Sequence, residues 1–342
     1  MIELWYGILV LMLTAYLILD GWNIGTGVVH YALSSSPEER RLNLRALGPT
    51  WSWHEVWLIS WGGTLFMAFP TIYASSFGGF YFAFFLVLWS FILRGIAIEV
   101  RNMIDDGMWR SVWDAAFWLS STALALLIGI SAANLLRGVP LDRHGDFTLP
   151  FFTNFAVHGA VGLLDWFTIP VGIYTVLALG AHGASYVAVR SHDAFRARAT
   201  ATARRWWLAV LVGLPVITIL TGCVRGGFFA HMLTSPAAWP GLLLIAGGAV
   251  GLVVGLWRVD ARWLFPAGCA VLAGLCIAAG AAMFPIMLLS TTPDGPSLSA
   301  WSCAIPHATL AATLLWWGLA ALLVGGYLYF VLRHASQGVD SH

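Results

Sequence analysis

The sequence has little charge and no lysine. Only 10% of its 342 residues are charged, whereas 59% are hydrophobic, and a soluble domain usually carries about 25% charged residues. All 17 basic residues are arginines, the formal net charge is +1, and no basic tract occurs. These shortages exclude a soluble domain, and they give no support to nucleic-acid binding.

Several site motifs are also missing. There is no CxxC or CxxCH, no phosphate-binding glycine loop, no zinc spacing and no nucleophile elbow. The four cysteines are therefore expected to be small buried side chains without disulfides or metal. Haem needs axial ligands held deep in a helical bundle, and most histidines here lie near the ends of apolar segments. We expect this chain to bind no cofactor and no metal.

Long apolar runs are what the sequence has in abundance. A membrane-spanning helix needs roughly 20 predominantly apolar residues, and Trp and Tyr gather at the ends of the runs, as interfacial anchors do. The N-terminus lacks the basic region and cleavage site of a signal peptide, so we expect its helix to be retained. The fold class predicted is an all-α integral membrane protein with about nine transmembrane helices. They are expected at about 4–31, 54–75, 79–100, 112–136, 155–189, 206–224, 239–257, 263–289 and 304–332.

Arginine is distributed unequally between the two sets of connecting loops. Thirteen arginines fall after odd-numbered segments or in the tail, and three fall after even-numbered ones. By the positive-inside rule the N-terminus is outside and the C-terminus is cytoplasmic. The polar connector near 137–154 separates four helices from the following five. We therefore predict two four-helix bundles with one additional helix, as a first bundle over residues 1–140 and a second over 141–342.

Charged side chains inside the predicted spans are the most informative feature. A charge at a helix centre costs at least about 2.5–3.5 kcal/mol on insertion scales. Asp20 lies roughly 24 Å along the first helix at 1.5 Å per residue, with Asn23 on the same face. His54 and Glu55 start the second helix from the same inner side, and the third returns to that depth with Arg94.

Two interpretations of this convergence remain open. Arg94 can neutralise Asp20 or Glu55 in a structural ion-pair network, to which Glu99 is assigned together with Arg94. Alternatively Asp20 and Glu55 take up protons from the cytoplasm, because carboxylates desolvated in a bundle can change protonation near neutral pH. Glu55 can also act as a first-turn acid and His54 as an interfacial histidine.

Three further polar residues have ordinary explanations. His158 and Asp165 are seven residues apart in the predicted 155–189 helix and share a face, which favours a hydrogen-bonded packing pair. Asp114 opens the predicted 112–136 helix and is expected to be an ordinary first-turn acid.

Ordered motifs at both ends of the chain resemble subunit II of the cytochrome bd-type quinol oxidases. LDGWNIGTG at 19–27 is similar to the DGFDxGxG stretch of that family, and GPTWSWHEVWLISWGGTLFMAFP at 48–70 is similar to PxWDGNEVWLxxxGGxLFAAFP. The matches cover most of residues 15–115 and 278–310. The remaining motifs are ERR at 39–41, RGIAIEVR at 94–101, WRSVWD at 109–114 and AMFP…SLSAW near the end.

The resemblance implies a respiratory enzyme that reduces O2 to water with quinol electrons. Subunit I of such an enzyme holds haem b with haem d, or haem b only, and oxidises the quinol. Subunit II covers it and helps provide a proton path. The implied partners are subunit I, quinol and membrane lipid, with a small single-helix subunit as a further candidate. The implied location is the cytoplasmic (inner) membrane of a bacterium or archaeon.

Three positions depart from the family pattern. Asn23 stands where the family usually has Asp, Ser52 replaces the Asp of WDGN, and His54 replaces its Asn. Asp20, Glu55 and Arg94 match. We therefore predict a proton path through Asp20, Asn23, Ser52, His54 and Glu55, displaced onto His54 and Glu55. The alternative to this path is a purely structural subunit, with protons entering through the partner. The alternatives to an oxidase subunit are a stand-alone transporter and a family-derived scaffold without oxidase activity.

Overall fold

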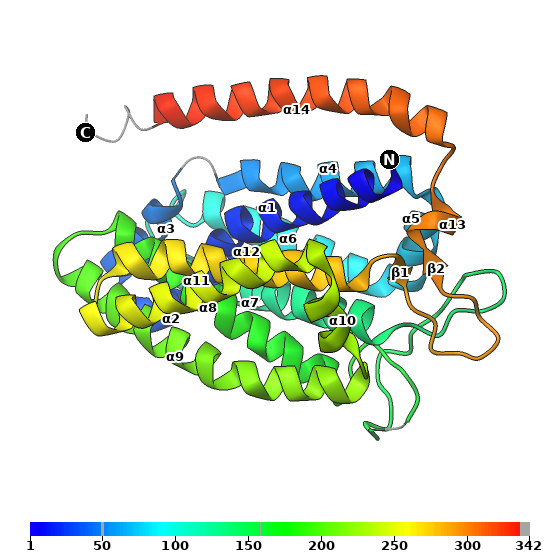
Figure 1. Ribbon diagram of the computed structural model, residues 1–342. Coiled ribbons are helices and arrows are strands. Elements are labelled where there is room, and N and C mark those ends of the chain that lie inside the picture. Colours follow the sequence, from blue (N-terminus) through cyan, green and yellow to red (C-terminus); the bar gives the residue numbers. More distant parts are fainter. Residues whose placement is uncertain (49–50, 158, 336–342) are drawn as a thin grey trace.

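The computed structural model describes residues 1–48, 51–157 and 159–335. Nearly all of the regular structure is helical (Figure 1). The first half contains α1 (Ile2–Val28), α2 (His30–Leu33), α3 (Pro37–Leu47), η1 (Trp51–His54), α4 (Glu55–Ala68), α5 (Pro70–Gly79), α6 (Tyr81–Val100) and α7 (Gly107–Arg137). The second half contains α8 (Thr168–Arg190), α9 (Asp193–Val224), α10 (Phe228–Thr234), η2 (Pro236–Ala238), α11 (Trp239–Arg258), α12 (Ala261–Met283), β1 (Ile286–Leu288), β2 (Leu298–Ser299), α13 (Ala300–Cys303) and α14 (His307–Ala335).

Eight helices within the described residues are long and apolar enough to cross a membrane. The predicted span 54–75 differs, because it is divided into α4 and α5. Pro70 has no N–H to continue the helix, and Phe69 before it has a non-helical backbone. The backbone N–H of Ile305 donates to the Ala68 oxygen at this break, at 3.2 Å. Together α4 and α5 carry the chain from one end of the molecule to the other, and α1 and α14 both run in the opposite direction (Figure 1).

Two other predicted helix boundaries were wrong. The predicted 155–189 helix begins only at Thr168, so the face that Asp165 was expected to share does not exist there, and His158 lies outside the described residues. Asp165 instead accepts hydrogen bonds from the backbone of Phe167 and Thr168 at 2.9 Å each. The second error has the opposite sign, because α9 is longer than predicted. It begins at Asp193, thirteen residues before the predicted 206, so the polar arginine-rich segment that precedes 206 is helical.

Helices from both halves of the chain share one packed core. The main cluster of buried apolar residues includes side chains of α1, α7, α8, α9, α11 and α12. α1 and α8 cross in close contact, because a Cβ at Gly25 would lie 1.8 Å from the Leu179 backbone oxygen and one at Gly183 would lie 2.2 Å from the Gly25 backbone. The crossing of small residues is typical of membrane helix packing. The division into two bundles at residue 140 stays a prediction.

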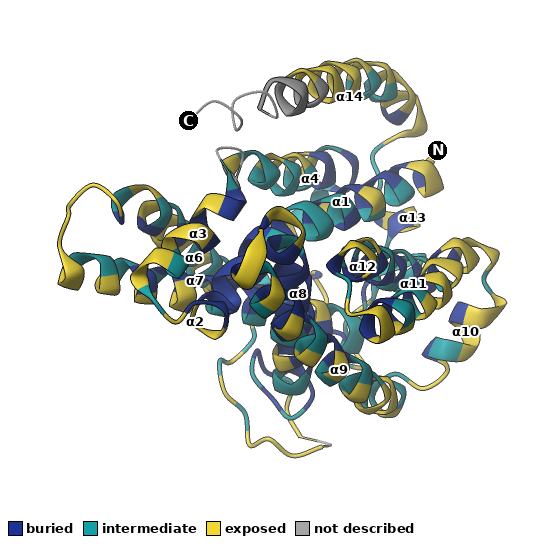
Figure 2. Ribbon diagram, turned by 90° about the vertical axis from the view of Figure 1, so that its left-hand side faces the viewer, coloured by how far each residue is buried: buried dark blue, intermediate teal, exposed yellow. Residues whose placement is uncertain are grey.

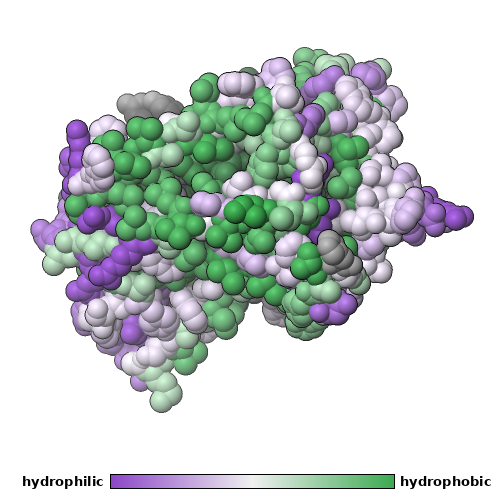
Figure 3. All heavy atoms as spheres, turned by 60° about the horizontal axis from the view of Figure 1, so that its bottom comes forward, coloured by the Kyte–Doolittle hydropathy of each residue, from purple (hydrophilic) through white to green (hydrophobic). Residues whose placement is uncertain are grey.

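The outside of the molecule suits a lipid environment. Buried residues gather along α8 and its neighbours, whereas the outer faces of the peripheral helices, α14 above all, are exposed (Figure 2). On the face shown in Figure 3, hydrophobic side chains cover the middle and hydrophilic ones gather toward the two ends. The turns with most of the arginines, around α3 and between α8 and α9 and α11 and α12, lie at one end, and α10, α13 and the strands lie at the other (Figure 1).

Candidate functional site: a buried ion-pair centre

Arg94 of α6 lies between two carboxylates that come from two other helices. Its Nη1 and Nη2 atoms are each 3.1 Å from Oδ1 of Asp20 on α1, and Nη2 is also 2.6 Å from Oε1 of Glu55 at the start of α4. Asp20 and Arg94 are fully buried, whereas the Glu55 side chain is 28% exposed. We call Asp20, Glu55 and Arg94 the acid-rich centre. It has two carboxylates that can each carry a negative charge around one fixed positive charge, and it is partly exposed at Glu55.

Asn23 and His54 adjoin the acid-rich centre. The amide nitrogen Nδ2 of Asn23 donates to Asp20 Oδ1 at 3.2 Å and lies 2.6 Å from Nδ1 of His54. The His54 ring makes an edge contact with Trp22, with centroids 5.2 Å apart. Because an amide nitrogen only donates, Nδ1 of His54 is the acceptor in this contact. Two of the positions that depart from the family pattern are therefore in direct contact with each other.

Two other predicted residues are placed differently. Ser52 is exposed in η1, and Glu99 is near the end of α6, beyond Arg94. The recorded ion pairs of Arg94 are with Asp20 and Glu55. A proton role for Ser52 and an ion-pair role for Glu99 stay predictions.

A second buried ion-pair centre was missed by the sequence reasoning. Asp114 is the eighth residue of α7, not a first-turn acid, because α7 begins at Gly107. Both its oxygens accept from Arg101, at 2.5 and 3.0 Å, and it also lies 3.0 Å from Nε2 of His30 and 3.5 Å from Nη1 of Arg40. We call Asp114, Arg101, Arg40 and His30 the base-rich centre. The sequence signal that could have predicted this centre is that Arg101 and Asp114 lie on the two sides of one short turn.

The hydrogen bonds of His30 fit a neutral ring. Nδ2 of Asn43 donates to its Nδ1 at 2.9 Å, which leaves the proton on Nε2 facing Asp114. Burial lowers the pKa of His30 from its ordinary value, against the raising effect of Asp114. Two guanidinium groups already outweigh the one carboxylate, and a neutral His30 adds no further positive charge.

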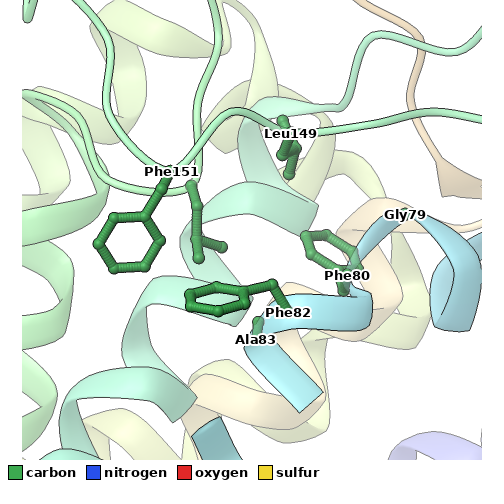
Figure 4. Close-up of a pocket in the computed structure, with 7 residues that line it drawn as sticks. Gly79, Phe80, Phe82, Ala83, Leu149 and Phe151 are labelled. Carbon is green, nitrogen blue, oxygen red and sulfur yellow. The ribbon is translucent and has the colours of Figure 1, made fainter. Parts of the chain in front are cut away.

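The two fully buried histidines among the described residues, His30 and His182, are engaged in other contacts. The part of the chain that the structure describes contains no group of three or more His, Cys, Asp or Glu side chains placed to hold a metal. Both ring nitrogens of His30 are engaged, and the buried ring of His182 stacks on Phe265 with centroids 5.2 Å apart. Two cavities of about 260 and 210 Å³ are smaller than the 300–1,000 Å³ typical of small-molecule sites. The larger one is lined by apolar and aromatic residues such as Phe80, Phe82 and Phe151 (Figure 4).

Fold and site together define a multi-pass α-helical membrane protein with a buried, acid-rich ion-pair centre. The family model for cytochrome bd terminal oxidase subunit II matches residues 1–335, and the chain belongs to that family.

Individual relatives agree with this assignment. The chain is 31% identical over 335 residues to cytochrome bd-I ubiquinol oxidase subunit 2 of Escherichia coli (strain K12), which covers 90% of this chain and 86% of that protein. It is 26% identical over 233 residues to cytochrome bd ubiquinol oxidase subunit 2 of Bacillus subtilis (strain 168), which covers 68% and 64%. The bd oxidase structure from Geobacillus thermodenitrificans contains a chain with the same fold, with a TM-score of 0.72 at 15% identity and 97% of each chain covered.

Family membership confirms the oxidase-subunit prediction over the transporter and scaffold alternatives. The chain is subunit II of a cytochrome bd-type terminal oxidase and a multi-pass protein of the bacterial inner membrane. Membership of this family implies a complex with subunit I.

Proposed function

We propose that this chain carries protons from the cytoplasm to the oxidase through the acid-rich centre, while subunit I holds haem b with haem d, or haem b only. Quinol gives the electrons in the partner, and O2 is reduced to water there. The names of the relatives, which are ubiquinol oxidases, support quinol as the substrate. The engagement of the buried His30 and His182 rings in contacts with other residues supports placing the haems in subunit I.

The observation that carries the proton proposal is that one arginine is shared by two carboxylates. With both acids ionised, the acid-rich centre has a net charge of −1, and an unbalanced charge in a low-dielectric site is costly. One added proton makes the centre neutral. Arg94 keeps its own charge at all relevant pH values, so the proton must go to a carboxylate. A centre built in this way can load and release a proton.

Glu55 is the entrance in this proposal. It is the exposed member of the centre, and it follows directly after η1 at the arginine-rich end. We assign that end to the cytoplasm by the positive-inside rule. With the N-terminus outside and the C-terminus in the cytoplasm, the chain must cross the membrane an odd number of times. The eight long helices and one further crossing formed by α4 and α5 together meet this requirement.

Asn23 and His54 connect Asp20 to the surroundings of Glu55 through uncharged side chains, at a place where the family has an acid. The family's Asp and Asn are replaced by Asn23 and His54, and the two side chains touch at 2.6 Å. One carboxylate is thereby lost from the centre and one titratable base is gained beside Glu55. Burial lowers the pKa of His54 from its ordinary value, so a proton that reaches its ring is passed on and not held. The route is therefore displaced by one residue toward Glu55 and is not abolished.

The test is Glu55→Gln in the complex of this chain with its partner. We expect quinol-dependent O2 uptake to fall by at least about tenfold, which corresponds to about 1.4 kcal/mol in the barrier, with the haem spectrum and subunit composition unchanged. Glu38→Gln, which changes an exposed acid of α3 at the same end, is the matched control and should leave the rate unaltered. Wild-type turnover in Glu55→Gln would contradict the proposal.

A further inference from the structure

Tyr16 is a buried hydroxyl beside the acid-rich centre that no step described so far uses. It lies one helical turn before Asp20 on α1 and is 2% exposed. Its hydroxyl lies close enough to Asp20 and Arg94 to interact with both, yet it makes no hydrogen bond of ordinary length within the described residues. A buried hydroxyl without a partner costs stability, and most buried polar groups in proteins are bonded to protein or ordered water.

Two neighbouring groups have unused hydrogen-bonding capacity as well. Nε of Arg94 is buried without a partner, because the contacts with Asp20 and Glu55 use its Nη atoms. Oδ2 of Asp20 accepts one recorded bond, from Nη2 at 3.3 Å, whereas Oδ1 accepts three. Because Tyr16 interacts with both Asp20 and Arg94, one donor, one acceptor and one group that can do both are available beside Asp20.

We infer that Tyr16, Arg94 Nε and Asp20 Oδ2 hold one internal water molecule, and that Tyr16 is the innermost proton carrier of this chain. Three polar partners are the usual number for a buried water. In this arrangement the water accepts from Arg94 Nε–H, donates to Asp20 Oδ2 and has its second hydrogen available for the Tyr16 oxygen.

This inference rests on the proposed proton route and extends it by one helical turn. One turn is about 5.4 Å along the axis, and Tyr16 lies on the side of Asp20 that is farther from the arginine-rich end. A proton that reaches Asp20 moves to the water, the water gives a proton to the Tyr16 oxygen, and Tyr16 gives its own hydroxyl proton to water on the path toward subunit I. Each carrier ends with the number of protons it began with, so Tyr16 needs no lasting charge.

Tyr16→Phe tests the role of the hydroxyl, and Tyr174→Phe is its matched control. Tyr174 on α8 also has a buried hydroxyl without a recorded partner, but no carboxylate or arginine interacts with it. Both variants remove one oxygen atom and keep the ring. Quinol-dependent O2 uptake of each purified complex would be measured in H2O and in D2O, with the reduced-minus-oxidised haem spectrum as the check on assembly.

We expect Tyr16→Phe to slow turnover by about tenfold and to raise the solvent isotope effect, with Tyr174→Phe unchanged in both. Equal rates and isotope effects in the two variants, with Glu55→Gln still slow, would overturn the role of Tyr16 and leave the proton route standing. A fast Glu55→Gln with a slow Tyr16→Phe would overturn the Glu55 entrance and support Tyr16.

A density map of the wild-type complex gives a second test that does not depend on a variant. A water peak within hydrogen-bond distance of Tyr16 Oη, Arg94 Nε and Asp20 Oδ2 supports the inference. A direct bond from Tyr16 to Asp20 with no water between them would overturn the proposed water site.

Discussion

The acid-rich centre and the base-rich centre have opposite charge balances. The acid-rich centre has two carboxylates around Arg94, and Glu55 leaves one side partly open. The base-rich centre has two arginines and a neutral histidine around Asp114, whose side chain is only 1% exposed. The first can correct its surplus by binding a proton. The second cannot, because arginine does not lose its proton in proteins.

This difference separates a centre that can bind and release a proton from one that can only stabilise the fold. Asp114 on α7 joins α2, α3 and the residue directly after α6, so it fixes the chain around the loops at the arginine-rich end. The acid-rich centre joins α1, α4 and α6 and retains a site where protonation changes the balance of charge. We therefore expect damage to the base-rich centre to affect stability and damage to the acid-rich centre to affect rate.

Asp114→Asn should give the largest loss of stability. It leaves Arg101, which is 2% exposed, without its counter-charge, and breaking a buried pair from one side costs about 3–5 kcal/mol. The measurement is the thermal midpoint and the yield of the assembled complex. Asp105→Asn is the control, since its pair with Arg110 is on the surface and exposed pairs contribute about 0–1 kcal/mol. Equal losses in the two variants would show that the base-rich centre is not structural.

Arg94→Gln should cost less stability and more activity. Removing the guanidinium leaves two acids, but they can be neutralised by protonation, so we expect a loss of about 1–3 kcal/mol. The deficit relative to wild type should shrink as the pH falls, because the acids lose charge. Thermal midpoints and O2 uptake measured across pH check both parts. A deficit that grows in acid would contradict the charge balance assigned to this centre.

His30→Gln should give the smallest effect, and one that depends on pH. Burial holds the folded pKa of His30 below its ordinary value, which is about 6.5 in an unfolded chain. Below that pH the unfolded chain binds more protons, so this group's contribution to stability is present above about 6.5 and is lost as the pH falls. The variant lacks this term. Its thermal midpoint should therefore fall less than that of wild type between neutral and acidic pH, and an equal fall would contradict a neutral buried His30.

The acid-rich centre could be predicted from the sequence because helices have a fixed rise. Counting residues along α1, α4 and α6 places Asp20, Glu55 and Arg94 at one depth, and a charge at that depth needs a partner. The contact between Asn23 and His54 could not be predicted in this way, since it depends on η1 placing His54 against α1.

The base-rich centre and the wrong helix boundaries have local causes. His30 reaches Asp114 only because α2 follows α1 directly, and α7 starts five residues before the predicted 112. The start of α9 is polar but helical, because arginine and alanine favour helices and Phe195, Ala199 and Ala203 pack into the core. The segment before α8 is apolar enough to suggest a helix, yet the backbone of residues 163–168 is held in a turn by hydrogen bonds of Asp165 and Thr168.

The most direct test of the central claim is proton uptake during a single turnover of the complex in oriented vesicles, with a pH indicator on the arginine-rich side. Our account predicts that wild type takes up protons from that side in step with O2 reduction, and that Glu55→Gln delays both the uptake and the late steps of the reaction. Uptake in Glu55→Gln at the wild-type rate from the same side would show that protons do not enter through the acid-rich centre.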